Sequence, residues 1–561
     1  MKESITGSPG PAARPRVGAD ASVGADASVD ADVDVVVVGA GVTGLYAVHR
    51  LRGLGHRVRG FERGDDVGGV WYWNRYPGAR CDVESVDYSY SFDEELQQEW
   101  DWSEKYAAQP EIVRYLRHVA DRFDLRPAYT FSTSVTSAEL DEETLRWTVR
   151  TDGGEVLTAR FVVFAVGCLS STHVPDIAGA GDFLGTVCHT GAWPREGVDF
   201  GGLRVGVIGT GSSGIQAIPL IAEQAAHLTV FQRSANFSIP AGNDPLDEET
   251  RRRQKAGYAE RRRLSRLSGG GSPHTAHRSA TFEVSAEERR AAYEERWRLG
   301  GVLYSKTFPD QLTDPAANDA ARAFWEEKVR GLVEEPATAD LLVPTDHPIG
   351  TKRIVTDSHY YEAFNRDDVR LVSLRGNPIE RIEATGIVLA DGTRVELDAI
   401  VFATGFDAMT GALDRVEVRG RGGRRLKDVW SGGPRTYLGL GVDGFPNLFN
   451  LTGPGSPSVM ANVVLCAEQH VDWLADCLAH LDERGHRAIE ASGEAVEEWV
   501  AQCRDRAAAT LFPAADSWYL GANIPGKPRV FMPFIGGFGV YGEIIADVAA
   551  SGYKGFTLIP E

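Results

Sequence analysis

The 561-residue chain lacks the features of secreted, membrane and nucleic-acid-binding proteins. Its six cysteines contain no CxxC pair, which predicts buried thiols in a reducing cytoplasm rather than a disulfide framework or a metal site. No apolar run approaches the ~18 residues that a membrane span needs. The formal net charge is −20, whereas phosphate binding needs concentrated Lys and Arg. The sequence therefore predicts a cytoplasmic protein with no membrane or nucleic-acid partner.

The composition is that of a folded protein that follows a disordered leader. With 43% hydrophobic and 25% charged residues, the chain is typical of a globular protein, and its length favours three or four folding units. Residues 1–32 are rich in Ala, Gly, Ser and Asp and repeat the motif VGADAS. They have too few large apolar groups to offset ordering entropy and no secretory cleavage pattern. We expect this leader to be disordered.

The first ordered segment carries a dinucleotide-binding motif. The β-branched run Val33–Val38 predicts a buried strand, which leads into a GxGxxG motif and a helix. The motif's glycines permit the tight turn, the close approach of a pyrophosphate and helix–strand packing; they are Gly39, Gly41 and Gly44. Glu62 ends the next strand and can bind ribose hydroxyls, and its charge would repel a 2′-phosphate. This unit suits FAD or NAD.

A second unit repeats this pattern with the opposite charge at its end. The strand Leu203–Ile208 leads into a second glycine motif, made by Gly209, Gly211, Ser212, Ser213 and Gly214. The following strand ends at Arg233 and Ser234, and Arg233 can pair with a 2′-phosphate. Lys352 is a candidate second clamp. This unit is expected to bind NADP rather than NAD.

The two motifs predict an α/β fold of two Rossmann-like dinucleotide-binding domains with a helical insertion. The strand-like segments Phe161–Gly167 and Ala399–Gly405 are expected to return the chain to the first domain. Residues 245–344 are charged and helix-prone, and Arg261–Arg263 predicts a solvated helix face. The expected division is a leader (1–32), an FAD-binding domain (33–160 and 398–561) and an NADP-binding domain with its linker (161–244 and 345–397), interrupted by the insertion (245–344).

The segment between the two units resembles a family fingerprint. FLGTVCHTGAWP matches the FxGxxxHxxxWP pattern of type I Baeyer–Villiger monooxygenases, with Phe183, Gly185, His189, Trp193 and Pro194 at its fixed positions. The resemblance extends over nearly all of the chain from Val33 to Pro560. It implies that His189 organises the interdomain linker and does not act as a base.

The same resemblance implies an active site. Arg353 is the expected catalytic cation, Asp82 its positioning partner, and Trp518 a contact of NADP. The segment Gly68–Asp82 resembles the family's flavin-adjacent region, and Ser456–Asn462 with Leu520 resembles its substrate pocket. Further cofactor-binding positions expected in or near that region are Gly69, Val70, Trp71, Tyr76, Asp82 and Tyr88, and Trp73 and Arg80 belong to the same segment.

The resemblance implies a reaction. NADPH reduces FAD, the reduced flavin adds O2 at C4a, and the resulting peroxide inserts one oxygen atom beside a ketone carbonyl to give an ester or lactone. NADP+ stays bound during oxygenation. The expected substrate is a bulky cyclic or steroid-like ketone, with a natural-product ketone as the alternative, and the expected oligomeric state is a monomer. A related N- or S-oxygenating enzyme is the second interpretation, and a non-enzymatic nucleotide-binding scaffold or redox sensor the third. A flavin disulfide reductase or NADPH oxidase is disfavoured because no CxxC or CxxxxC pair is present.

Overall fold

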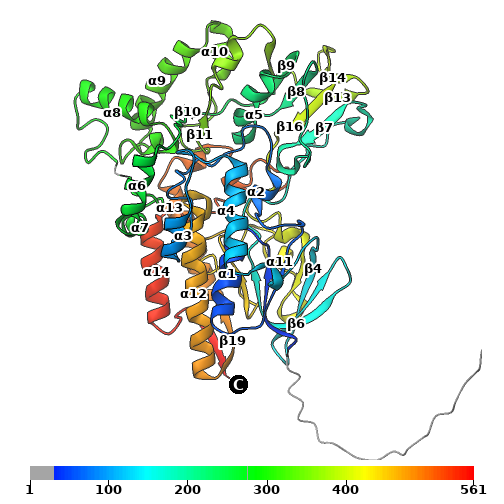
Figure 1. Ribbon diagram of the computed structural model, residues 1–561, viewed down its shortest axis with the longest axis vertical. Coiled ribbons are helices and arrows are strands. Elements are labelled where there is room, and N and C mark those ends of the chain that lie inside the picture. The colour runs from blue at the N-terminus through cyan, green and yellow to red at the C-terminus, as the bar shows by residue number, and fades with distance from the viewer. Residues whose placement is uncertain (1–30, 275, 561) are drawn as a thin grey trace, which may run out of the picture.

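The computed structural model describes residues 31–274 and 276–560 and contains two dinucleotide-binding domains joined side by side (Figure 1). Thirty of the 32 residues of the expected leader lie outside the described part. Within that part, no helix combines the length and the apolar character needed to cross a membrane. All six cysteines are free, and Cys168 alone among them is not fully buried.

The first domain is built on an eight-stranded mixed sheet. Its main order is β17-β4-β5-β6-β1-β2-β3, with β18 also paired to β6. The central pairs β1/β2 and β1/β6 are parallel, and β4/β5 and β5/β6 are antiparallel. The strands are β1 (Val33–Val38), β2 (Val58–Phe61), β3 (Tyr129–Thr130), β4 (Val135–Asp141), β5 (Arg146–Thr151), β6 (Val156–Phe164), β17 (Glu417–Arg419) and β18 (Leu448–Asn450).

Helices from both ends of the chain cover this sheet. Helix α1 packs along α12, and α12 packs along α14, so segments far apart in sequence form one layer (Figure 1). The helices of this domain are α1 (Val42–Gly53), α2 (Val70–Trp73), α3 (Glu94–Glu99), α4 (Gln109–Arg122), α11 (Leu426–Val429), α12 (Val463–Arg484), α13 (Gly493–Ala508) and α14 (Phe538–Ala550), with the hairpin β19 (His486–Ala491) and β20 (Phe556–Pro560).

The second domain is built on a five-stranded parallel sheet of order β12-β9-β8-β16-β7. Its elements are β7 (Thr186–His189), β8 (Arg204–Ile208), α5 (Ser212–Ala222), β9 (His227–Gln232), β12 (Val369–Ser373) and β16 (Ala399–Phe402). Smaller sheets join β10 (Ser238–Pro240) to β11 (Val355–Asp357), and β13 (Ile379–Glu383) to β14 (Gly386–Leu389) and β15 (Arg394–Glu396).

Strand β16 corrects one expectation from the sequence. The segment Ala399–Gly405 was expected to lie in the first domain, but β16 sits between β8 and β7 in the second sheet. Its all-apolar sequence fits a central parallel strand of either sheet, so hydrophobic pattern could not distinguish them. The companion segment Phe161–Gly167 does begin in the first sheet, because β6 runs without a break across residue 160.

The insertion is helical, but part of it packs on the first domain. It contains α6 (Glu248–Ala256), α7 (Tyr258–Leu267), α8 (Ala286–Leu299), the 3-10 helix η4 (Val302–Lys306), α9 (Pro315–Leu332) and α10 (Pro336–Leu342). Helix α7 packs against α14. The insertion therefore bridges both domains.

The packing of α7 also shows that the expected solvated face at Arg261–Arg263 is wrong for two of the three arginines. Arg262 is 3% exposed and donates to Ser89 at 2.7 Å, and Arg261 donates to both carboxylate oxygens of Asp87 at 2.6 and 2.7 Å. Arg263 remains exposed and pairs with Glu260 in its own helix. Arg261 and Arg262 therefore bind buried acceptors that lie far away in the sequence.

Candidate active site

The first glycine motif forms a crowded turn that side chains could not enter. Gly39 has φ +108°, and a Cβ there would lie 2.6 Å from the Ala165 carbonyl oxygen. A Cβ on Gly44 would meet the Gly39 carbonyl oxygen at 1.8 Å, so the helix can approach the strand only with glycine. Gly41 lies against Gly69, whose own Cβ would be 2.8 Å from the Gly41 Cα. These contacts bring the backbone of the turn within reach of a pyrophosphate.

Glu62 lies beside this turn, at the end of β2. Its carboxylate accepts hydrogen bonds from the backbone N–H groups of Ala40 (2.8 Å) and Gly64 (2.7 Å). Burial raises its pKa, and the two backbone donors partly offset that effect. Glu62 lines the larger cavity, and a carboxylate has more acceptor sites than these donors occupy, so a ribose could bind there.

The second motif repeats the geometry around a more open turn. Gly209 has φ +109°, and a Cβ on Gly214 would lie 2.3 Å from the Gly209 carbonyl oxygen. Around Gly211 a Cβ would meet nothing within 4 Å, which leaves space for a phosphate at the N-terminus of α5. Ser213 bonds Thr190 across 3.0 Å, and Ser212 lines the cavity of the first domain.

Positive charge gathers at the far end of this second site. Arg233 is exposed at the end of β9, and its charge contributes to lowering the pKa of Lys352, after the larger effect of burial. Ser234 follows Arg233 and accepts a hydrogen bond from Thr210 through its carbonyl. The structure thus brings Arg233 and Lys352 together, and two neighbouring cations favour a doubly charged anion between them.

Arg353 and Asp82 form a bidentate pair. Arg353 Nε and Nη2 donate to the two Asp82 oxygens at 2.8 and 2.7 Å, and Nη1 donates to the Val459 carbonyl at 2.8 Å. Each side chain is 25% exposed. Burial works against the charge, but Asp82, followed by the neighbouring Tyr519, outweighs it and raises the pKa of Arg353 above its usual value. The guanidinium is a fixed, permanent cation.

Two cavities meet at this pair. The larger, of about 540 Å³, extends from Gly39 and Glu62 to Arg353, and Trp518 forms part of its wall. The smaller, of about 210 Å³, lies between the first domain and the insertion. Arg353 and Asp82 line both cavities. A group bound in either cavity can therefore reach the same guanidinium.

The flavin-adjacent segment of the sequence lines the larger cavity. Trp71 donates from its indole nitrogen to the Tyr88 hydroxyl at 3.0 Å, which holds both rings in place. Tyr76 donates to Gln216 of α5 at 2.8 Å, a contact between the two domains. The remaining expected members of this wall are Gly69, Val70, Trp73 and Arg80.

Of the fingerprint residues, His189 contacts the segment that joins the two domains, and Phe183, Gly185 and Trp193 lie within the second domain. His189 Nδ1 accepts from the Gly191 N–H at 2.9 Å, so Nε2 carries the proton and points at the His173 carbonyl, 3.3 Å away. Burial lowers the pKa of His189 and keeps it neutral. The other four residues have structural roles. Phe183 and Trp193 are buried in the hydrophobic cores of the second domain, and Pro194 ends the motif. A Cβ on Gly185 would lie 2.2 Å from the Asp398 carbonyl oxygen, so only glycine fits there.

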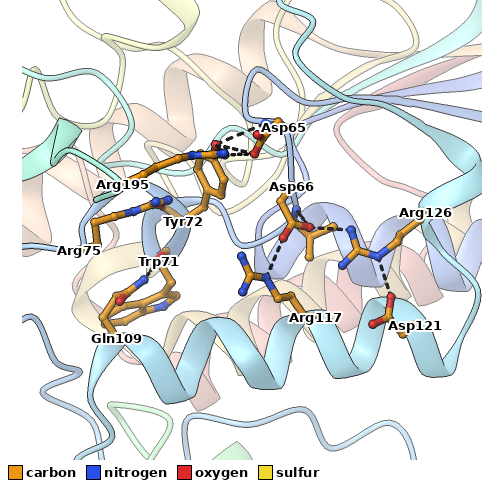
Figure 2. A network of polar contacts seen from close by, with 11 residues as sticks. Asp65, Asp66, Trp71, Tyr72, Arg75, Gln109, Arg117, Asp121, Arg126 and Arg195 are labelled. Atoms are coloured by element: carbon orange, nitrogen blue, oxygen red, sulfur yellow. Dashed lines mark hydrogen bonds and ion pairs between the residues drawn. The ribbon is translucent and has the colours of Figure 1, made fainter. Parts of the chain in front are cut away.

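The residue after the fingerprint ties its linker to the first domain (Figure 2). Arg195 bonds Asp65 and the Tyr72 hydroxyl, which itself donates to Asp65 at 2.7 Å. The adjacent Asp66 pairs with Arg117 of α4 at 2.7 Å, so the network continues into the helical layer. The linker is therefore held by charge on the surface of the flavin-adjacent segment.

Sequence patterns missed several contributors to the site. Val459 acts through its carbonyl, which no residue type reveals. Tyr519 lies beside Arg353, although the sequence had singled out its neighbour Trp518. Gln216 lies two residues beyond the second glycine motif and meets Tyr76 only because the two domains dock. Residues 305 and 306 of the insertion line the smaller cavity. Of these contributors, only Lys306 had a feature that could have been noticed in the sequence, its charge.

Comparison with known proteins places this geometry in a family. Residues 36–245 match the family model described as pyridine nucleotide-disulphide oxidoreductase. The chain is 45% identical to a Baeyer–Villiger monooxygenase of Pseudooceanicola batsensis, over 93% of this chain and 95% of that protein. It belongs to the Baeyer–Villiger monooxygenase family.

The chain is also similar to two other monooxygenases. A solved structure titled oxidized steroid monooxygenase bound to NADP is 67% identical, with a TM-score of 0.91, and covers 94% of this chain and 100% of that one. A phenazine N-monooxygenase of Lysobacter antibioticus is 42% identical over 94% of this chain and 97% of that protein.

Family membership confirms four expectations: the fold of two dinucleotide-binding domains, the flavin monooxygenase class, and FAD and NADPH as cofactors. The individual site residues remain predictions.

Proposed function

We propose that this Baeyer–Villiger monooxygenase converts a bulky cyclic or steroid-like ketone into an ester or lactone, with O2 as co-substrate. The observation that carries the proposal is the Arg353–Asp82 pair, a permanent cation at the meeting point of two cavities. Oxygen insertion beside a carbonyl generates negative charge on oxygen, and a fixed guanidinium stabilises it.

The residues present fit the two cofactors. The larger cavity offers a glycine turn for a pyrophosphate, Glu62 for a ribose and an aromatic wall at Trp71 for the flavin ring. The second turn at Gly211 and the cations Arg233 and Lys352 suit NADPH. When bound, these groups supply hydride and activate O2.

The chain's own residues supply position and charge. Asp82 and the Val459 carbonyl hold Arg353 by three hydrogen bonds, so little reorganisation is needed as charge develops. Trp518 lines the larger cavity and would contact the nicotinamide part of NADPH. Residues of the insertion form one wall of the smaller cavity and would limit the entry of water, which would divert the oxygen to hydrogen peroxide.

The two relatives support different substrates, and they differ in how similar they are to this chain. The steroid monooxygenase structure, at 67% identity, supports a bulky ring system. The phenazine N-monooxygenase, at 42% identity, supports nitrogen oxygenation as a second candidate. Arg353 favours the ketone, because it stabilises the anion that forms when a carbonyl carbon is attacked.

Incubation with NADPH and a panel of steroidal, cyclic and aryl ketones, plus a phenazine, tests the proposal. We expect ketone products heavier by one oxygen atom in mass spectrometry. Arg353→Ala should still reduce its flavin but should form no ester. Ester formation by Arg353→Ala would exclude the proposed role, and oxygenation of the phenazine alone would favour the second candidate.

We further propose a monomeric, cytoplasmic enzyme with FAD-binding, NADPH-binding and insertion parts, in which β6 belongs to the FAD-binding part and β16 to the NADPH-binding part. Its six free thiols suit a reducing compartment. Light scattering of the purified protein tests the monomer, and limited proteolysis tests the boundaries.

A further inference from the structure

The smaller cavity has a polar wall that the reaction described above does not use. One side is formed by Asp82 and Arg353, and the opposite side comes from the insertion, including Lys306 at the end of η4 and Gly270 in the loop after α7. A Cβ on Gly270 would lie only 3.2 Å from Lys306 Nζ, so the absence of a side chain there leaves room for the ammonium.

Lys306 has no bonding partner in the part of the chain that the structure describes. No hydrogen bond or ion pair joins its ammonium to residues 31–274 or 276–560, and Lys306 is an exposed residue that lines the cavity, so a ligand entering the cavity can contact it. Burial lowers its pKa, and the charge of Arg353 lowers it further. An ammonium held close to a second cation favours binding an anion.

The nearby carboxylates are already engaged. Asp82 is paired with Arg353, and Glu84 and Asp87 are paired with Arg261 at 3.1 and 2.6 Å. His274 adds no charge, because burial lowers its pKa to about 4.

We propose that Lys306 binds a carboxylate carried by the ketone substrate and thereby directs the carbonyl towards Arg353. The inference rests on the proposed function and narrows its substrate class to keto acids on a bulky skeleton. A carboxylate would satisfy the unpaired ammonium with a charge-assisted hydrogen bond. Lys306 is thus a specificity-determining residue, and it takes no part in the chemistry.

Steady-state kinetics on matched substrates tests the proposal. A cyclic keto acid and its methyl ester differ only in the charge that Lys306 would bind. We expect kcat/KM of the wild-type enzyme to be about tenfold higher for the acid, the size of a hydrogen bond to a charged group. Lys306→Met should remove this preference by raising the KM for the keto acid, and the kinetic constants for the methyl ester substrate should not change. Lys306→Arg should restore most of it, and Lys427→Met, an exposed lysine on α11, should change nothing.

Equilibrium binding separates this inference from the proposed function. Calorimetric titration of the oxidised holoenzyme with the keto acid should give a Kd about tenfold weaker for Lys306→Met than for the wild type. Equal Kd values, absent binding, or equal losses for acid and ester would overturn the role of Lys306. Turnover of the ester without turnover of any keto acid would leave the monooxygenase proposal standing and sink this one.

Discussion

At the scale of single residues, the arginine at the junction of the cavities depends on its carboxylate. Replacing Asp82 with Asn removes the charge that holds Arg353 while preserving shape. We expect ester formation to fall by at least about a hundredfold and the free energy of unfolding to fall by about 2 kcal/mol. Rapid-mixing kinetics should show flavin reduction by NADPH largely retained.

The matched control is Asp505→Asn, which breaks an exposed pair with Arg504 on α13. Exposed pairs contribute less than about 1 kcal/mol, so this variant should behave as the wild type. Full ester formation by Asp82→Asn would mean that Arg353 does not need its partner.

Coenzyme choice is also a residue-scale property. Arg233→Ala removes one of two cations expected to clasp a 2′-phosphate. The KM for NADPH should rise by about ten- to a hundredfold, and the KM for NADH, which has no such phosphate, should stay the same. Equal changes for both coenzymes in initial-rate assays would contradict the assignment.

The buried carboxyl group of Asp357 makes the stability of the protein depend on pH. Asp357, 4% exposed at the end of β11, has a pKa raised to about 6 by burial. Because the folded state binds this proton more tightly than the unfolded state, stability is lost as the pH rises through about 4 to 6. Asp357→Asn should therefore stabilise the protein by about 2 kcal/mol above pH 7. The gain in melting temperature should shrink as the pH falls towards 4. A gain that stays constant with pH would contradict the raised pKa of Asp357.

The sequence revealed those residues whose role lies in their own chemistry. Gly39, Glu62 and Arg233 occupy fixed places in a strand–turn–helix pattern, so local spacing predicts where they lie. Val459 lies in the predicted pocket segment Ser456–Asn462, but its contact with Arg353 and that of Tyr519 escaped prediction, because a carbonyl or a neighbouring ring acts only through the position that the fold gives it. Lys306 escaped for a further reason: its importance lies in having no partner, which only a three-dimensional arrangement reveals.

At the scale of elements, local periodicity predicted helices and strands well but not their neighbours. The apolar strand β16 was expected in the first domain and lies in the second, and α7 was expected to face solvent and packs on α14. In both cases the position of the element is decided by contacts with residues more than a hundred positions away in the sequence. Strand β16 pairs with β8, and Arg261 of α7 bonds Asp87.

The linker after the fingerprint offers a test at this scale. Arg195→Ala removes its bonds to Asp65 and Tyr72 (Figure 2). Arg195 is exposed, so the free energy of unfolding should change by less than about 1 kcal/mol. A looser domain contact should nevertheless admit water, and we expect a larger fraction of consumed NADPH to appear as hydrogen peroxide.

A peroxide assay against NADPH consumption measures this uncoupling. Arg298→Ala, which breaks an exposed pair within α8, is the control. Equal coupling efficiency in the two variants would show that the Arg195 contact does not seal the site.

At the scale of the whole molecule, the two domains are joined by paired linkers. The segments after β6 and after β16 run antiparallel, with Thr172 bridged to Phe406 and the His173 N–H donating to the Gly405 carbonyl at 3.0 Å. The Thr404 hydroxyl donates to the His173 carbonyl at 2.6 Å, and His189 packs against the same carbonyl. Because the two linkers are bonded to each other, we expect them to act as a hinge that moves as one unit.

Such a hinge suits an enzyme that must use one active site for hydride transfer and then for oxygen transfer. We expect the second domain to change its position between these steps. Cysteines introduced at Asp65 and Arg195 and joined by a short bismaleimide would hold the linker to the first domain. Most native thiols are buried, so labelling should be selective. The crosslinked enzyme should lose most of its turnover, whereas the two single-cysteine variants treated with the same reagent should not. Unchanged turnover of the crosslinked enzyme would show that catalysis proceeds without this motion.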